Sequence, residues 1–205
     1  MSLILGIDTS NYTTSLAVVD TEHKTAIQSK KLLPVAEGAL GLRQSDAVFH
    51  HTVQLPQLFE QLKCQCQLSD VTAVGVSVTP RSEEGSYMPC FLSGVSAATA
   101  FAMSGNLPIY RFSHQQGHIA AALFCTDKLE LLNETFLAFH VSGGTTEAVI
   151  VTPDKDNICK TQLVATSLDL KAGQAVDRVG VAMGISFPAG KQLDELAIAI
   201  VETEE

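Results

Sequence analysis

The chain has 205 residues, of which 46% are apolar, 17% charged and 6% aromatic, a composition that indicates a folded globular protein and excludes a disordered one. The formal net charge of −9 argues against nucleic-acid binding by this chain alone, because neutralising phosphates requires a basic face. No apolar run reaches the roughly 20 residues of a membrane span. The start lacks a basic segment before its apolar run, and the five cysteines form no CxxC pair; we therefore expect a cytoplasmic protein with reduced thiols.

The first half of the chain alternates between apolar runs of strand type and longer segments with a helical period. Its first 20 residues contain two apolar runs around the hydroxyl-rich turn TSNYTT, which predicts strand, turn and strand. Farther on, Ser113 precedes HQQGH and can cap a helix that runs to about Cys125. The elements expected between them are a strand at 24–33, a helix at 45–68, a strand at 71–78, a small-residue helix at 92–103 and a strand at 109–112.

The pattern then restarts in the second half, with strands expected at 136–141, 147–152 and 159–166 and helices at 173–184 and 191–202. Placing Ser10 over Ser142 also places Thr14 over Thr146, with apolar strands on both sides of each turn. Such an internal duplication is a signal of fold. It predicts an α/β protein of the actin-like, ribonuclease H-like (ASKHA) architecture, in which two hairpin turns hold a nucleotide's phosphates from both sides.

The duplication also divides the chain. We expect residues 1–134 to form a first lobe that includes the HQQGH helix, and residues 135–205 to form a partial second lobe. Fewer residues follow the second hairpin than follow the first, so the second lobe is expected to be incomplete.

The segment HQQGH offers two metal ligands. His114 and His118 are four residues apart, so on a helix they share one face and both imidazoles can reach one ion. The spacing is common, and a helix face with two solvated or hydrogen-bonded histidines is the alternative. His140 ends the strand before the second turn and could supply a third imidazole.

The second turn, SGGTT, resembles a phosphate-binding loop. Gly143 and Gly144 follow a strand, and glycines there allow backbone N–H groups to approach an anion. A tight hairpin turn that uses glycine for geometry alone is the alternative. In the first hairpin, Asp8 ends its strand and is the candidate catalytic residue, able to orient water or magnesium near a phosphate; a solvated or capping aspartate is the alternative.

Two further carboxylates lie on the last two expected helices. Asp177 follows AGQAV, and Asp194 follows FPAGKQL. Carboxylates in such places can accept hydrogen bonds from ribose or substrate hydroxyls, although a surface carboxylate is the default interpretation of either one.

Four segments, in this order and spacing, resemble the TsaD/YgjD family: GIDTSNYTTSLAVVD, HQQGHIAAAL, VSGGTTEAVIV and AGQAVDRVGVAMGISFPAGKQLDELA. The resemblance implies the actin-like fold and transfer of a threonylcarbamoyl group from threonylcarbamoyl-adenylate to the adenosine beside the anticodon of tRNA, with a bound iron or zinc ion. The family's older name, O-sialoglycoprotein endopeptidase or glycoprotease, fits poorly, since the chain has no nucleophile or HExxH pattern for proteolysis.

The resemblance also implies roles for single residues. His114 and His118 match the family's metal ligands, and His140 stands where archaeal and eukaryotic members have a tyrosine ligand. The residues expected to bind nucleotide or substrate are Ser10, Ser142, Gly143, Gly144, Asp177, Gly190 and Asp194.

Several positions depart from the family pattern. Tyr12 and Thr13 replace an acidic pair in the first hairpin, Thr145 replaces a histidine, and TPRSEEGSYMP replaces a glycine-rich segment. The family's C-terminal metal-binding aspartate and adenine-binding asparagine match no position up to residue 205. We therefore expect a divergent paralogue.

The resulting hypothesis is a metal-dependent, nucleotide-binding threonylcarbamoyl transferase acting on tRNA adenosine. Its expected ligands are one iron or zinc ion, ATP, AMP or threonylcarbamoyl-adenylate, and magnesium on the phosphates. We expect tRNA binding only together with partner proteins, a homodimer or a heterodimer with a protein of related fold, and no membrane association. The alternatives are a non-catalytic scaffold like the TsaB partner of this family and an ASKHA small-molecule kinase.

Overall fold

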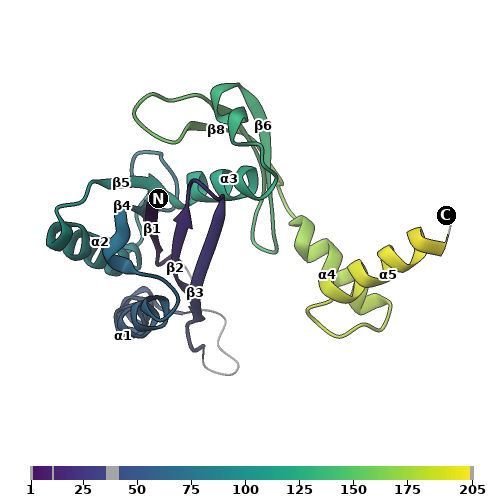
Figure 1. Cartoon of the computed structure of the whole chain (residues 1–205). Helices are drawn as coiled ribbons and strands as arrows, with labels where there is room; N and C mark the ends of the chain where they lie inside the picture. Colours follow the sequence, from purple (N-terminus) through teal and green to yellow (C-terminus); the bar gives the residue numbers. More distant parts are fainter. Residues whose placement is uncertain (1, 11, 36–41, 204–205) are drawn as a thin grey trace. The chain divides into compact units, whose positions relative to one another are not determined.

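The computed structural model describes residues 2–10, 12–35 and 42–203 (Figure 1). The chain divides into two compact units, one formed by Met1–Leu129 and Lys155–Ile158, the other by Glu130–Asp154 and Cys159–Glu205. Residue 11 of the expected first turn lies outside the described residues. None of the helices in the described ranges is long and apolar enough to cross a membrane.

The first unit is built on a five-stranded sheet of order β3-β2-β1-β4-β5. β2 pairs antiparallel with both β1 and β3, whereas β4 runs parallel to β1 and β5 parallel to β4. This confirms the α/β class expected from the alternating pattern. The strands are β1 (Leu3–Asp8), β2 (Thr13–Asp20), β3 (Thr25–Leu32), β4 (Val71–Thr79) and β5 (Ile109–Ser113).

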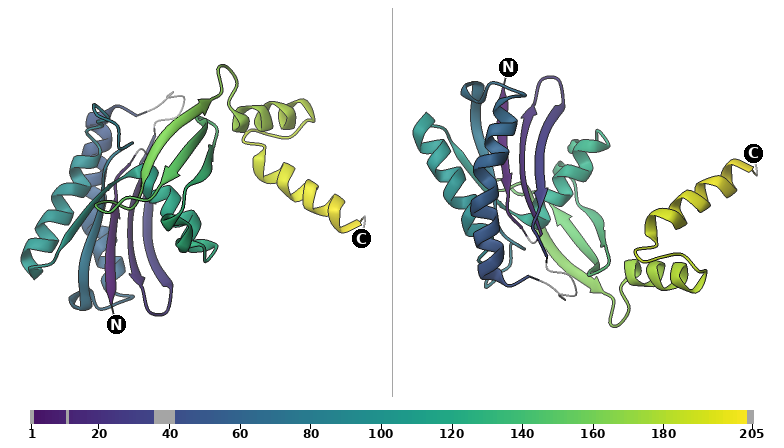
Figure 2. Two further views of the ribbon diagram at one scale, coloured as in Figure 1. Left: turned by 90° about the horizontal axis from the view of Figure 1, so that it is seen from above. Right: turned by 90° about the horizontal axis from the view of Figure 1, so that it is seen from below.

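Helices α1 (Gln44–Lys63) and α2 (Phe91–Gly105) cover one face of this sheet, and α3 (His114–Cys125) lies on the other (Figure 2). Alternate residues of each strand point to the helix-covered face, where burial of apolar side chains supplies the main stabilisation. The residues of this core are Leu3, Leu5, Ile7, Leu16, Val18, Leu55, Leu58, Leu62, Val71, Val74, Val76, Ala98 and Ala102.

One predicted boundary is wrong. The helix expected to reach residue 68 ends at Lys63, and a short 3₁₀ turn, Leu68–Asp70, follows. The backbone N–H groups of Gln65 and Cys66 both donate to the carbonyl of Leu62, which tightens the last turn and ends the helix. The apolar period continued to Leu68 because that side chain still packs on the core, but it does so from the turn.

Asp20 builds the turn between β2 and β3. Its Oδ1 accepts the backbone N–H groups of Glu22 (2.9 Å) and His23 (3.1 Å), and its Oδ2 lies 2.6 Å from His23 Nδ1. The side-chain hydrogen bond and the opposite charges raise the pKa of His23 and lower the pKa of Asp20 from their ordinary values.

The second unit contains a three-stranded antiparallel sheet of order β6-β7-β8 followed by two helices. Gly180 allows the first helix to approach the start of the second closely, because an added Cβ would fall 2.2 Å from the Cβ of Ala189. The elements are β6 (Phe136–Val141), β7 (Thr146–Thr152), β8 (Lys160–Thr166), α4 (Ala172–Ala182) and α5 (Gly190–Thr203), with a 3₁₀ turn, Leu129–Asn133, before β6.

The pairing registers of the two hairpins agree with the duplication seen in the sequence. In the first hairpin Leu5 pairs with Val18, and in the second Leu137 pairs with Ile150, each residue shifted by the same 132 positions. The environments differ, however. Leu5 is fully buried beneath the helices, whereas its counterpart Leu137 is 51% exposed.

This pair of leucines gives a matched test of the core. We expect Leu5→Ala to lower the free energy of unfolding by about 2–5 kcal/mol, because it removes buried methyl groups and leaves a cavity. Leu137→Ala, the same change at the exposed counterpart, is expected to cost less than about 1 kcal/mol. Urea unfolding followed by circular dichroism measures both, and equal losses would contradict this account of the core.

The Asp20–His23 contact predicts a pH dependence. Since the folded-state pKa of His23 is raised, the stabilisation is full below the unfolded value of about 6.5 and is lost as pH rises through the folded pKa. We expect Asp20→Asn to lower the pKa of His23 towards its ordinary value, measured by NMR titration of the imidazole. An unchanged midpoint in Asp20→Asn would disprove the pairing.

Candidate functional site

The first turn of α3 is fixed by a capping box. Ser113 Oγ accepts the backbone N–H of Gln116 (3.2 Å), and Gln116 Oε1 accepts the backbone N–H of Ser113 (2.8 Å). These reciprocal bonds satisfy two helix-end donors and set where the helix begins. His114 is therefore the first helical residue, as the sequence predicted, directly after strand β5.

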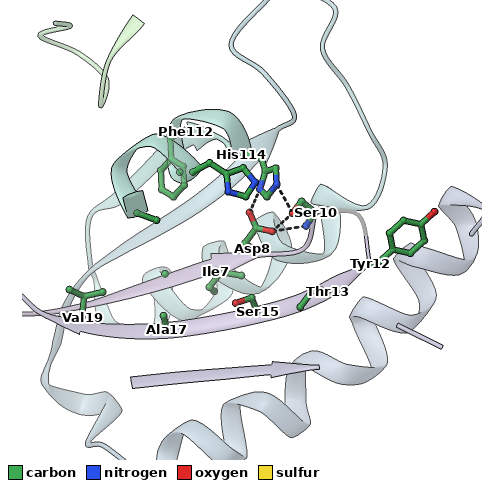
Figure 3. A pocket seen from close by; sticks show the side chains of 14 residues that line it. Ile7, Asp8, Ser10, Tyr12, Thr13, Ser15, Ala17, Val19, Phe112 and His114 are labelled. Atoms are coloured by element: carbon green, nitrogen blue, oxygen red, sulfur yellow. Dashed lines mark hydrogen bonds and ion pairs between the residues drawn. The ribbon is translucent and has the colours of Figure 1, made fainter. Parts of the chain in front are cut away.

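An open pocket of about 750 Å³ lies between α3 and the sheet face that α1 and α2 leave uncovered. Figure 3 shows Asp8, Ser10 and His114 pointing toward one another in it, with Tyr12 at its edge. Small and apolar residues form its floor. The complete lining is Gly6, Ile7, Asp8, Ser10, Tyr12, Thr13, Ser15, Ala17, Val19, Phe112, His114, Gly117, His118 and Ala121.

The Asp8 carboxylate holds the polar end of this pocket together. Its Oδ1 accepts hydrogen bonds from the backbone N–H (2.8 Å) and the hydroxyl of Ser10. Its Oδ2 accepts hydrogen bonds from the Ser77 hydroxyl (2.6 Å) and from His114 Nδ1 (2.9 Å). Each oxygen thus has two donors, which matches the roughly four lone-pair positions that an ionised carboxylate offers.

These donors also decide the charge of Asp8. Burial by itself raises the pKa of this carboxyl, but the hydrogen bond and charge of His114 and the hydroxyls of Ser10 and Ser77 together hold the pKa well below its usual value. Asp8 is therefore ionised at neutral pH and acts only as an acceptor.

An acceptor at Asp8 fixes the hydrogen on the His114 ring. Nδ1 must donate, so in the neutral ring Nε2 carries the lone pair. Nε2 lies 3.4 Å from Ser10 Oγ, and the hydroxyl hydrogen of Ser10 is directed to Asp8. In its neutral form His114 thus presents an acceptor nitrogen to the pocket.

His118 completes the pair on the same face of α3. Its ring centroid lies 4.1 Å from that of His114, with the ring planes 67° apart. The spacing of four residues places the two imidazoles together, as expected from helix geometry. The structure therefore brings Asp8, Ser10, His114 and His118 to one site.

The expected third imidazole belongs to the second unit. His140 lies on β6, half-buried, and pairs in register with Glu147 of β7. Its role as a ligand stays a prediction. Within the described residues no group of three or more histidine, cysteine, aspartate or glutamate side chains is arranged to hold a metal ion.

The SGG turn is closed by Ser142. Its hydroxyl accepts the N–H groups of Gly144 (3.3 Å) and Thr145 (3.0 Å). A Cβ added to Gly143 or Gly144 would meet nothing within 4 Å, and neither backbone lies in the left-handed region. Packing and local geometry therefore do not require glycine at these two positions, unlike Gly173, whose Cβ would lie 2.6 Å from the backbone nitrogen of Gly143.

The two carboxylates of the C-terminal helices occupy separate places. Asp177 Oδ1 accepts the backbone N–H of Ala189 (2.9 Å), just before α5, and so caps that helix. Asp177 lines one pocket of about 460 Å³ with Arg178 and Phe187. Asp194 and Gly190 line another pocket of similar size. Their roles toward a ribose or substrate stay predictions.

Sequence reasoning missed Ser77. The residue lies on β4, and the pairing of Ile7 with Val76 brings it beside Asp8 across the parallel strands. No motif marks it. The available signal was a serine near the carboxyl end of the apolar strand VTAVGVSV.

The family model and the curated relatives that match this chain bear the same name. Residues 31–204 match the family model described as TsaD, tRNA N6-adenosine threonylcarbamoyltransferase. A protein of that name from Streptococcus pneumoniae (strain ATCC BAA-334 / TIGR4) is 33% identical over 203 residues, which cover 95% of this chain and 55% of the relative. One from Pediococcus pentosaceus is 34% identical, over 96% of this chain and 54% of the relative. The chain thus spans about half the length of these curated relatives.

Similarity to a solved structure indicates the fold. A ROK family protein from Streptococcus pneumoniae TIGR4, solved in complex with sucrose, superposes with a TM-score of 0.50 at 14% identity, covering 96% of this chain and 68% of that one. YeaZ from Pseudomonas aeruginosa gives a TM-score of 0.49 at 15% identity, covering 84% and 68%. Given the match of its family model over most of the sequence, the chain belongs to the TsaD family and has an actin-like α/β fold.

Proposed function

We propose that this chain acts in the threonylcarbamoylation of a tRNA adenosine, as a metal-dependent and nucleotide-binding transferase. The observation that supports this most is the first-unit site, where the Asp8 carboxylate holds Nδ1 of His114 and leaves Nε2 facing the pocket beside His118. The family model that matches residues 31–204 bears the name of this reaction. The chain covers about half of its relatives' length, so the activity is inferred from the family and from the site.

The residues present fit an iron or zinc ion. Metal-binding histidines commonly donate their other ring N–H to a carboxylate, which fixes the tautomer and the ring orientation. Asp8 and His114 have this arrangement, and neutral imidazoles suit iron and zinc better than magnesium. His114 and His118 would hold the ion, with His140 as the expected third ligand.

When bound, the metal would act as a Lewis acid on a carbamoyl or phosphate oxygen of the adenylate. The chain's own residues prepare that site. Asp8 orients His114, and the side chains of Ser10 and Ser77 keep the carboxylate in place. The four acceptor positions of the Asp8 carboxylate all hold donors from this chain. The direct catalytic role expected for Asp8 stays a prediction.

The SGG turn is the expected phosphate-binding element. The open space at Gly143 and Gly144 would let an anion approach the backbone, which side chains would otherwise prevent. Asp177, Gly190 and Asp194 would then contact the ribose or substrate, and magnesium, where used, would accompany the phosphates.

The charge of the chain bears on its partners. A net charge of −9 repels the phosphates of tRNA, so we expect tRNA to bind only when partner proteins supply a basic surface. A homodimer, or a heterodimer with a protein of related fold, is the expected assembly.

A non-catalytic scaffold is the second candidate function. Tyr12 and Thr13 line the pocket at the positions where bacterial family members usually have an acidic pair. Loss of two carboxylates beside the site would weaken catalysis while leaving the fold intact.

Metal content tests the histidine pair. We expect purified protein to retain iron or zinc, and His114→Ala and His118→Ala to lose most of it, because each substitution removes one imidazole ligand. His50→Ala, on α1, is the matched control and is expected to retain the metal. The measurement is elemental analysis by mass spectrometry on folded protein, and equal metal in the wild type and in His114→Ala would end the claim.

Nucleotide preference separates the candidate functions. Calorimetric titration with ATP, AMP and a threonylcarbamoyl-adenylate analogue is expected to give the tightest binding for the analogue. Gly144→Val is expected to weaken that binding at least tenfold, equivalent to about 1.4 kcal/mol, because the side chain fills space that the fold leaves open. Preference for ATP would indicate a kinase, and absence of binding a scaffold; either result contradicts the transferase.

A further inference from the structure

We propose that Ser77 is a positioning residue that fixes the Asp8 carboxylate and, through it, the direction of His114 Nε2. This inference rests on the proposed function only in that His114 is taken as a metal ligand. It concerns a residue of β4 that belongs to none of the segments carrying the family resemblance.

Ser77 lies inside its strand, whereas the carboxylate that it contacts belongs to the last residue of a strand. It is fully buried, and its strand pairs with β1 on one side and β5 on the other. Asp8, in contrast, is the last residue of β1, where the chain leaves the sheet for the first turn. A donor on a central strand therefore gives the carboxylate a fixed point of attachment.

The hydrogen bond of Ser77 is made to the same carboxylate oxygen that His114 contacts. Ser77 Oγ donates to Asp8 Oδ2 over 2.6 Å, and the same oxygen accepts His114 Nδ1 over 2.9 Å. Ser10 donates to the other oxygen. Removing the Ser77 hydroxyl would leave Oδ2 with one donor and free the carboxylate to rotate about its bond to Cβ, carrying the imidazole with it.

Ser77 differs in this respect from Ser10. The Ser10 hydroxyl also lies 3.4 Å from His114 Nε2, on the side that would face a metal, so substituting it would disturb both faces of the ring. The Ser77 hydroxyl donates to the carboxylate, at the oxygen that also accepts His114 Nδ1. Its substitution therefore isolates the positioning effect from any direct effect on the ion.

The experiment uses the full chain, with Co²⁺ as the probe and spectroscopic titration as the readout. Outer partners of a metal-binding histidine typically contribute 10–100-fold in affinity, so we expect Ser77→Ala to weaken Co²⁺ binding by about that factor. Ser77→Thr, which keeps the hydroxyl, is expected to recover most of it. Ser29→Ala is the matched control, because Ser29 is also buried and donates to a side chain, Gln61 Oε1, at 2.7 Å.

A second readout needs no metal. Long-range ¹H–¹⁵N NMR spectra report which imidazole nitrogen carries the hydrogen. We expect a single Nδ1–H form of His114 in the wild type and in Ser29→Ala, and a mixture of both forms in Ser77→Ala. A purely structural role for Ser77 would lower stability without changing the tautomer.

The outcomes separate this inference from the proposed function. If His114→Ala loses Co²⁺ while folded Ser77→Ala binds it within twofold of the wild type, the positioning role of Ser77 is overturned. The same holds if Ser29→Ala weakens binding as much as Ser77→Ala. If His114→Ala binds Co²⁺ like the wild type, the proposed metal site fails instead, and the tautomer spectra still decide the role of Ser77.

Discussion

An ionised carboxylate with every acceptor position filled is the constraint on which the site depends. Four donors converge on Asp8: the N–H and hydroxyl of Ser10 in the first turn, the Ser77 hydroxyl on β4, and His114 Nδ1 at the start of α3. A part-buried charge without such partners would be costly, so the fold and the ionisation of Asp8 support each other. As a consequence, the hydrogen bond from His114 Nδ1 to the carboxylate determines that Nε2 faces the pocket.

The order of the strands explains why Asp8, Ser77 and His114 meet. In an actin-like unit the first hairpin lies beside a parallel strand, and the helix after the last strand crosses the remaining face of the sheet. Asp8 and Ser77 thus come together at the carboxyl ends of β1 and β4, and α3 begins there with its histidines. The second unit repeats the hairpin with the same register, but its turn carries Gly143 and Gly144 where the sequence of the first has Asn11 and Tyr12.

Much of this arrangement could be predicted from the sequence, because it follows from local rules. Apolar runs located the strands, and the spacing of His114 and His118 placed two imidazoles on one helix face. The end of α1 was misplaced, because Leu68 keeps the helical period while packing from a turn. Ser77 was missed because its role depends on a partner 69 positions away, and only the pairing of β1 with β4 brings the two together. The bond of Asp177 to the backbone of Ala189 has no local signal in the sequence, and the role of Asp177 toward a substrate stays a prediction.

Through its hydrogen bond to Nδ1, Asp8 orients His114 so that Nε2 faces the metal of the proposed site. Crystals of the full chain grown with zinc or iron, measured at the metal's absorption edge, test it most directly. We expect an anomalous peak within bonding distance of Nε2 of His114 and of a ring nitrogen of His118, with Asp8 still hydrogen-bonded to Nδ1. A peak coordinated by the Asp8 carboxylate itself, or by Nδ1 of His114, would contradict it.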